Sequence, residues 1–416
     1  MSSPDAPHVV VVGTGIAGIT TAETLRASGF DGRITVVGDE PDLPYRRTAL
    51  SKDIVSADLS TAKVTLRKPG FWAERGIEFR TGTTAVGIDT AARTVSFDDR
   101  TEIAYTALVL ATGGTPRRFS WMTRDVAVLR NRADALAVQA QLTTGTPLIV
   151  IGGGLIGMEL AASATGAGVP VTVLEAADRP MGRVLPPDVS DVIAAAHRAH
   201  GVDVITDVSI TAAAADHVEG DGFDTPATGF VVAALGMVPN TGLAAKAGLR
   251  IGTSGIVVDA HLRTSAPGVY AAGDVAEYPH PLTGTHHRSE HWLTAGDQGK
   301  VAASTILADL GYDAEPSTTP VPLAWTVQYG TNIQIAGWPA EGDRIEVDGS
   351  LSDLDATIRV FDGELLVGAV AVGRPAHGRK TREEITACLT QSQSPVETSS
   401  TPSPDSRPSS AISLAG

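Results

Sequence analysis

Two copies of one glycine pattern, about 140 residues apart, most constrain how this chain can fold. Each copy places Gly-x-Gly-x-x-Gly between an apolar run and a helix-like segment. The first copy predicts a buried parallel strand at 8–12 and a helix at 16–27 capped by Gly29, then a strand at 33–37. The second copy predicts a strand, a helix and a strand at 147–151, 156–167 and 169–175. The repeat predicts an α/β fold with two Rossmann-like dinucleotide-binding units.

Each glycine of the pattern has its own physical reason. The first, Gly13 or Gly152, permits a tight turn, and the second, Gly15 or Gly154, lets the backbone approach a pyrophosphate. The third, Gly18 or Gly157, lets the helix pack close to the strand. The pyrophosphate would then lie against free N–H groups at the positive end of the helix dipole.

An acidic residue follows the second strand of each unit, as a ribose-binding residue should. In the first unit it is Asp39 or Glu40, and in the second it is Glu175. Glu175 would repel a 2′-phosphate, which favours NADH over NADPH, although Arg179 and Arg183 lie near enough to weaken that preference. Two such sites predict a bound flavin and a visiting nicotinamide, with hydride passing from nicotinamide C4 to flavin N5.

Composition limits the function classes. The formal charge of −15 argues against binding to nucleic acid or to an anionic membrane. No apolar run is long enough to cross a bilayer and the first residues do not read as a signal peptide, so we expect a cytoplasmic protein. The single cysteine, Cys388, excludes a redox-active pair within the chain. The loosely spaced histidines 286, 287 and 291 read as loop residues, and we predict no metal site.

Several segments together resemble the FAD-dependent ferredoxin reductases that serve cytochrome P450s and aromatic-ring oxygenases. The similarity runs from about residue 7 to 385, in segments at 38–52, 107–118, 150–162, 268–278, 288–303 and 321–337. It implies a glutathione reductase-like fold with a C-terminal α+β interface domain. It also implies electron transfer from NADH through FAD to a ferredoxin, in a monomer or weak dimer.

The resemblance implies a boundary scheme for the chain. An FAD-binding domain is expected at 1–118 and 244–316, an NAD(H)-binding domain at 119–243 and an interface domain at 317–390. In the interface domain, short β-like runs suggest a meander, and 381–389 a closing helix. Residues 391–416 are almost all Ser, Pro, Thr and Gln and are expected to be disordered.

The same resemblance implies roles for single residues. Lys52 would lie beside flavin N5 and stabilise the reduced flavin, Glu159 would lie near the nicotinamide, and Trp325 would face the isoalloxazine. Asp274 would bind the ribityl chain and Trp292 would lie by the flavin ring. Further cofactor contacts are expected at Ile16, Ala17, Ala85, Ala111, Thr112, Gly113, Arg130, Ile156, Gly236 and Gly273.

The chain departs from the family pattern near the expected flavin. Thr48 and Ala49 stand where prolines are usual, and Leu155 where an aromatic residue often covers the flavin. Leu323, Ala324 and Val327 replace two aromatics and an acid around Trp325. These differences leave the acceptor site open to change.

Three other functions remain to be weighed against the reductase. A flavin disulfide reductase or thiol peroxidase needs a cysteine near the flavin, and the stretch after Asp39 has none. An NADH:quinone reductase or NADH oxidase would have the same cofactors, and a flavoprotein redox sensor or scaffold would respond without turnover. For docking an acidic ferredoxin, the candidate basic residues are Arg46, Arg47, Arg67, Lys68, Arg288 and Lys300.

Overall fold

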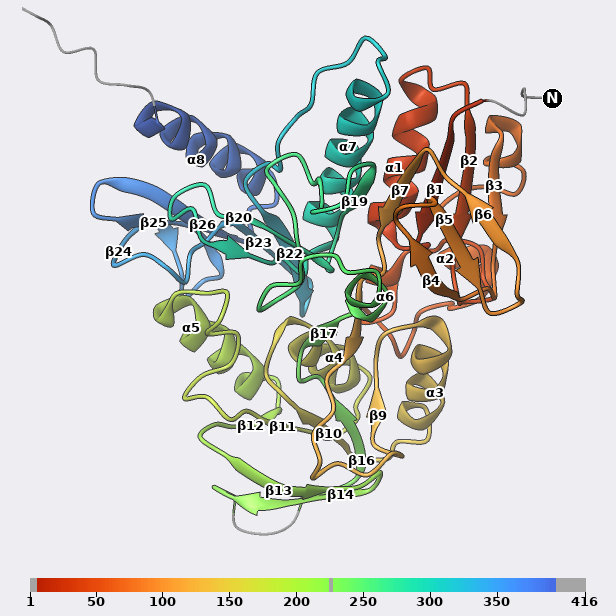
Figure 1. Ribbon diagram of the computed structural model, residues 1–416. Helices are drawn as coiled ribbons and strands as arrows, with labels where there is room; N and C mark the ends of the chain where they lie inside the picture. Colours follow the sequence, from red (N-terminus) through yellow and green to blue (C-terminus); the bar gives the residue numbers. More distant parts are fainter. Residues whose placement is uncertain (1–5, 224–226, 394–416) are drawn as a thin grey trace, which may run out of the picture.

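The computed structural model describes residues 6–223 and 227–393 (Figure 1). Its first sheet is parallel and contains the first glycine unit. The strand order is β19-β7-β1-β2-β3, formed by β1 (His8–Val12), β2 (Arg33–Val37), β3 (Ile77–Arg80), β7 (Ala107–Leu110) and β19 (Val269–Ala271). Helices α1 (Ile16–Ala27) and α7 (Trp292–Asp309) pack against each other beside it. The strands predicted at 8–12 and 33–37 are confirmed; Ser28 rather than Gly29 caps α1, and Gly29 follows with φ of +86°.

The second sheet repeats this plan around the second glycine unit. Its order is β12-β11-β10-β16-β9, formed by β9 (Ala127–Val128), β10 (Leu148–Ile151), β11 (Val171–Leu174), β12 (Asp203–Ile205) and β16 (Phe230–Ala233). Its helices are α3 (Arg132–Leu142), α4 (Leu155–Gly166) and α5 (Pro187–Ala199). An outer antiparallel sheet consists of β13 (Ser209–Ala213), β14 (His217–Asp221) and β15 (Ala227–Thr228).

Smaller elements join the two units. An antiparallel sheet contains β4 (Ala85–Asp89), β5 (Thr94–Phe97) and β6 (Glu102–Ala104). The next strand along the chain, at 107–110, is β7 of the parallel sheet. Strands β8 (Gly114–Pro116) and β17 (Met237–Pro239) pair where the chain leaves the first unit and where it returns. The predicted boundaries at 118 and 243 fall near this pair and stay predictions. The remaining short elements are β18 (Ile256–Val257), β20 (Ala276–Pro279), β21 (His286–His287), α2 (Thr61–Val64), α6 (Gly242–Lys246), η1 (Arg47–Ala49) and η2 (Ala73–Arg75).

The C-terminal region is an antiparallel sheet covered by one helix. Its order is β22-β23-β26-β25-β24, formed by β22 (Leu323–Gln328), β23 (Thr331–Gly337), β24 (Arg344–Ser350), β25 (Asp355–Asp362) and β26 (Leu365–Val372). A simple meander is therefore wrong, because β23 pairs with β26. Helix α8 (His377–Gln393) extends beyond the predicted 381–389 and includes 391–393, which were assigned to the tail; residues 394–416 lie outside the described residues.

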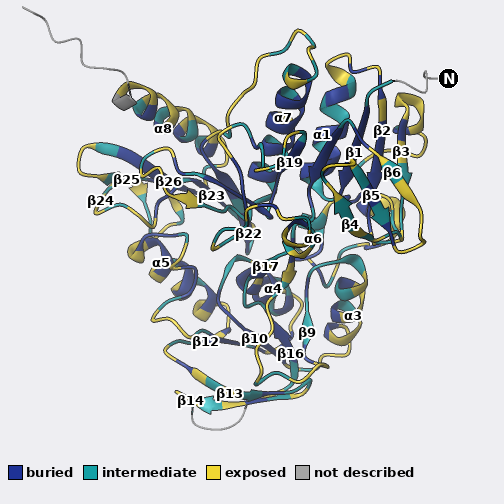
Figure 2. Ribbon diagram, in the orientation of Figure 1, coloured by how far each residue is buried: buried dark blue, intermediate teal, exposed yellow. Residues whose placement is uncertain are grey.

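One buried cluster joins all three regions and so fixes the space between them. It includes Leu50 and Ile54 of the loop after β2, Met158 of α4, and Ile333 and Val370 of the C-terminal sheet. Figure 2 shows α4 mostly as buried ribbon. In the part of the chain that the structure describes, no helix is long and apolar enough to cross a membrane.

Candidate active site

The two glycine turns have the geometry of nucleotide cradles. Gly13 has φ of +124°, and a Cβ there would lie 2.1 Å from the Ala111 carbonyl oxygen; at Gly152, with φ of +105°, it would lie 2.6 Å from the Ala234 oxygen. Neither position tolerates a side chain.

The other glycines of the two patterns fall into two groups, those in close contact with neighbouring backbone and those that face open space. A Cβ on Gly18 would lie 2.2 Å from the Gly13 oxygen, and one on Gly157 would lie 2.1 Å from the Gly152 oxygen. By contrast, Gly15 and Gly154, the N-caps of α1 and α4, have nothing within 4 Å of such an atom. The space in front of both helix N-termini is therefore open, as a pyrophosphate requires, and the residues fit FAD and a nicotinamide dinucleotide.

One cavity is lined by residues of both units and of the C-terminal sheet. Most of the predicted site residues line it: Gly13, Gly15, Ile16, Ala17, Asp39, Lys52, Ala111, Thr112, Gly113, Arg130, Ile156, Glu159, Gly273, Asp274, Trp292 and Trp325. It also contains Arg47, Thr48, Leu50, Ser51, Leu129, Leu155, Glu290, His291 and Ala324, among others. The fold thus brings 16 positions, spread from residue 13 to 325, to one space.

A buried ion pair lies in this cavity. Lys52 Nζ pairs with Glu159, whose side chain is only 5% exposed. The carboxylate also accepts hydrogen bonds from Ser51 Oγ and, at 2.7 Å, from Thr326 Oγ1. Lys52 Nζ lies 5.3 Å from the centre of the Trp325 ring, a cation–π contact. Three donors from two other regions of the chain, the loop after β2 and strand β22, thereby satisfy one carboxylate that would otherwise be costly to bury.

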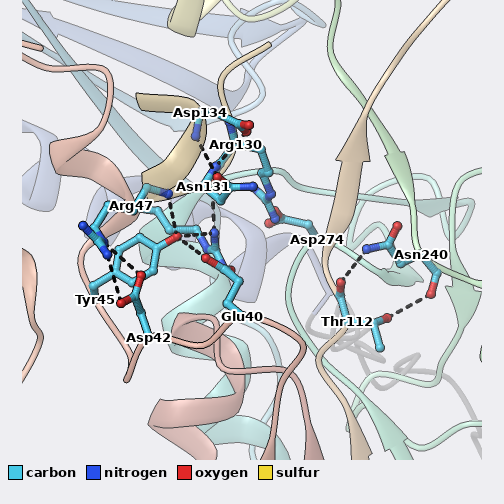
Figure 3. Close-up of polar contacts among 11 residues, drawn as sticks. Glu40, Asp42, Tyr45, Arg47, Thr112, Arg130, Asn131, Asp134, Asn240 and Asp274 are labelled. Carbon is cyan, nitrogen blue, oxygen red and sulfur yellow. Dashed lines mark hydrogen bonds and ion pairs between the residues drawn. The ribbon is translucent and has the colours of Figure 1, made fainter. Parts of the chain in front are cut away.

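An arginine network closes the side of the cavity next to the first unit (Figure 3). Arg47 pairs with Glu40 and donates to the Tyr45 hydroxyl at 2.9 Å and to the Arg130 carbonyl at 3.2 Å. Arg130 faces Asp274 at 3.4 Å, and burial lowers the pKa of its guanidinium while Asp274 opposes that shift. Of the two acids offered for the ribose, Glu40 is thus taken up by this network, whereas Asp39 lines the cavity.

A bidentate ion pair extends the network to α3. Arg132 donates to both carboxylate oxygens of Asp42, at 2.9 and 3.1 Å, and its backbone N–H donates to the Tyr45 hydroxyl at 3.1 Å. The segment 40–47 is therefore attached to the start of α3.

In the second unit the acidic residue binds its own loop. Glu175 accepts hydrogen bonds from the backbone N–H groups of Gly153, at 2.6 Å, and Ala177, at 2.8 Å. Arg179 pairs with Asp178 at 2.9 Å, and Arg183 lies near Gly236, where a Cβ would be 3.7 Å from its Nη1. A fixed negative charge therefore stands beside the glycine turn.

Seven predicted cofactor contacts do not line the cavity. Gly18, Gly152 and Gly157 shape the turns, and Gly154, Glu175 and Gly236 lie around the second turn, where a nicotinamide dinucleotide would enter. Ala85 begins β4 and packs against the core of the first unit. Its role in binding FAD stays a prediction.

Among the family departures, Thr48, Leu155 and Ala324 line the cavity. Leu323 instead packs with Val321, Trp338 and Ile385 under α8. The alternation of β22 explains this, because neighbouring residues point to opposite faces of a sheet.

Sequence reasoning missed the groups that hold Glu159. Ser51 precedes Lys52 and Thr326 follows Trp325, so each adjoined a residue already chosen. Thr326 reaches Glu159 because its strand packs against α4, and no pattern in the sequence shows that tertiary contact.

The predicted docking arginines and lysines are mostly neutralised. Arg47 pairs with Glu40, Arg67 with Glu23 at 2.5 Å, Arg288 with Glu290 at 2.5 Å and Lys300 with Asp297 at 3.0 Å. Arg46 and Lys68 have no carboxylate partner among residues 6–223 and 227–393. Cys388 lies on α8 beside the C-terminal cluster and does not line the cavity. No group of metal-ligating side chains was found in the same described ranges.

The fold and the two cradles define a class of two-dinucleotide oxidoreductase, and comparison with known families agrees. The chain belongs to the pyridine nucleotide-disulphide oxidoreductase family, whose model matches residues 7–299, and a reductase C-terminal domain matches 323–399.

Within that family, several relatives are named as ferredoxin reductase components and one as a rubredoxin–NAD(+) reductase. It is 36% identical to rhodocoxin reductase of Rhodococcus erythropolis over 88% of this chain and 86% of the relative. It is 38% identical to the anthranilate 1,2-dioxygenase system ferredoxin–NAD(+) reductase component of Burkholderia cepacia, over 88% and 91%. The solved covalent putidaredoxin reductase–putidaredoxin complex matches with a TM-score of 0.86 and 32% identity, over 92% of this chain and 94% of that one.

Proposed function

We propose that this protein oxidises NADH and passes single electrons through bound FAD to a ferredoxin that serves a cytochrome P450 or Rieske-type oxygenase. The observation that carries the proposal is the single cavity: it contains the first cradle's Gly15, the α4 residues Ile156 and Glu159 of the second unit, and Trp325. Relatives named as reductase components of dioxygenase systems support electron flow from NADH toward a ferredoxin.

The chain's own residues bind, orient and shield. The N-terminus of α1 and the guanidiniums of Arg47 and Arg130 present positive charge to a diphosphate. Asp39 and Asp274 offer carboxylates to sugar or ribityl hydroxyls. FAD, when bound, supplies the conversion of a two-electron donor into two one-electron steps.

The Lys52–Glu159 pair supplies charge where reduction occurs. The Lys52 ammonium stabilises negative charge that arrives in the cavity, and Glu159 holds that ammonium in place. Leu155, at the first position of α4, covers this region without an aromatic ring. The nicotinamide would reach the cavity past the exposed Ile156.

The preference for NADH belongs to the same proposal. Both carboxylate oxygens of Glu175 bind backbone amides, so the side chain cannot swing away from an incoming 2′-phosphate. The negative charge of Glu175 would repel the 2′-phosphate of NADPH and so disfavour its binding.

The test is spectroscopic, then kinetic. Purified protein should show flavin absorbance that bleaches anaerobically on addition of NADH, and a purified ferredoxin should then support steady cytochrome reduction. A colourless protein after reconstitution with FAD contradicts the proposal. NADH-dependent bleaching with oxygen or quinone as the only productive acceptor favours the oxidase alternative instead.

A further inference from the structure

A line of hydrogen bonds leads away from Glu159, out of the cavity. Thr326 Oγ1 donates to Glu159 Oε1 at 2.7 Å, and Gln328 Nε2 donates to Thr326 Oγ1 at 3.4 Å. His197 Nε2 lies 2.8 Å from Gln328 Oε1, and the Tyr329 hydroxyl lies 3.0 Å from His197 Nδ1. We call Thr326, Gln328, His197 and Tyr329 the polar chain.

The chemistry of these groups fixes one direction for the polar chain. The Gln328 amide nitrogen only donates, so its oxygen accepts, and His197 must have its proton on Nε2. Nδ1 of His197 is then the acceptor for the Tyr329 hydroxyl. Burial lowers the pKa of His197 to about 4 and raises that of Tyr329 to about 12, so both are neutral near pH 7. Every donor therefore points toward the Glu159 carboxylate, an arrangement in which hydrogen bonds polarise one another.

The polar chain crosses between two regions of the molecule. His197 lies on α5 below the C-terminal sheet, and Thr326, Gln328 and Tyr329 lie on β22 and its turn (Figure 1). His197 is fully buried and Gln328 is 4% exposed. Such a buried polar connection does not arise from general packing, because each unpaired group would be costly.

A strained turn supports a specific role for Tyr329. Tyr329 and Gly330 form the two-residue turn between β22 and β23, with φ of +50° and +76°. Turns of this kind favour Asn or Gly, and a bulky aromatic residue there is unusual. The Tyr329 ring stacks on His200, with centroids 3.7 Å apart, while its hydroxyl contacts His197. Strained residues persist where surrounding contacts require them.

We propose that the polar chain is a positioning device: it holds the Glu159 carboxylate in one orientation, and thereby fixes the Lys52 ammonium in the cavity. Glu159 has one donor from each of Ser51, Lys52 and Thr326, and the polar chain strengthens the last of these. Its residues do not line the cavity and act only through Glu159. The inference rests on the proposed reduction of flavin by NADH and adds residues to which the resemblance assigns no role.

The main experiment removes the hydroxyl that ends the polar chain. In Thr326→Val we expect the rate of flavin reduction at saturating NADH to fall about tenfold, the loss of one hydrogen bond to a charged group, with little change in KM. We also expect the flavin midpoint potential to become more negative, because the Lys52 charge is held less firmly. Thr326→Ser keeps the hydroxyl and should restore both quantities.

The matched control is Thr357→Val. Thr357 is equally buried in the same sheet, but its hydroxyl forms its hydrogen bond with His377 Nδ1, at 2.7 Å, and not with Glu159. Its variant should keep the wild-type rate and potential. A Thr326→Val protein with the same rate and potential as Thr357→Val overturns the inference.

A second measurement does not depend on turnover. Imidazole ¹⁵N resonances should show His197 neutral, with its proton on Nε2, near neutral pH in the flavin-free and flavin-loaded protein. Tyr329→Phe, which keeps the ring, should shift those resonances. A His197 imidazolium, or a proton on Nδ1, overturns the polar chain. If NADH does not reduce the wild-type flavin, the proposed function fails, and the tautomer in flavin-free protein still decides the inference.

Discussion

The two glycine units share one backbone plan but close the space before the helix differently. In the first, the segment 40–47 contributes Arg47 to the cavity and is held by Arg130, by the bidentate Arg132–Asp42 pair and by the Arg47–Glu40 pair. In the second, Glu175 is bound to its own loop, and Ile156 at the start of α4 is 40% exposed. No ion pair in the described ranges involves Arg183.

This difference is what two dinucleotides with different lifetimes require. A cofactor that stays bound benefits from a network that must break before release, because each broken buried ion pair is costly. A substrate that exchanges at every turnover needs a preformed turn with an open approach. Under the proposed function, the roles of the two units would be set by the residues after the strand, not by the glycines themselves.

Substituting the second glycine of each unit should have the largest effect and tests directly whether the two units bind different dinucleotides. Gly15→Ala adds a methyl group to open space at the first cradle and should yield folded protein that has lost its FAD and all activity. Gly154→Ala should keep FAD and raise the KM for NADH at least tenfold. Flavin absorbance per protein and steady-state kinetics measure both. Equal flavin loss in both variants would show that the units are not specialised.

Lys52 should have the next largest effect. Lys52→Met keeps the length of the side chain and removes the charge, so flavin reduction by NADH should slow about a hundredfold, a loss typical of one electrostatic group in an active site. Stopped-flow bleaching at saturating NADH is the measurement. Lys246→Met, on α6 and outside the cavity, should react like wild type. A Lys52→Met rate within threefold of wild type would remove Lys52 from the reaction.

A substitution of Glu175 tests whether the second unit selects NADH over NADPH. Glu175→Ser removes the fixed negative charge, and the ratio of kcat/KM for NADH to that for NADPH should fall about tenfold, a difference of about 1.4 kcal/mol. Part of the change will be weaker NADH binding, because Gly153 and Ala177 lose their hydrogen-bond acceptor. Glu219→Ser, on the outer sheet, is the control. An unchanged ratio would place selectivity elsewhere.

The sequence predicted the elements that local residue patterns determine, and it missed features that depend on how strands and helices pair in the folded chain. The strands at 8–12 and 33–37 and both glycine turns follow from apolar runs and spacing. Lys52, Glu159 and Trp325, to which the resemblance assigns roles at the flavin, line one cavity, and those roles stay predictions. Strand β24 was missed because Arg344–Ser350 is an edge strand with three charged residues in seven, and little of it is buried.

The polar chain could not be predicted for a related reason. His197 reads as one more residue of an amphipathic helix, and Gln328 as one polar residue of a strand. Their contact depends on how α5 meets the β22–β23 turn, 131 residues away in the chain. Periodicity identifies which face of a helix or strand is apolar, but not which other element packs against that face.

The smallest expected effect concerns the docking of the ferredoxin. Because four of the six candidate basic residues already have carboxylate partners, the apparent Kd for a ferredoxin should rise only about threefold between about 50 and about 300 mM salt. Lys68→Gln should weaken binding more than Lys300→Gln, since Asp297 already neutralises Lys300. A rise of more than about thirtyfold over the same range would mean that the partner's carboxylates displace those internal ones. The basic patch inferred from the sequence would then form only in the complex.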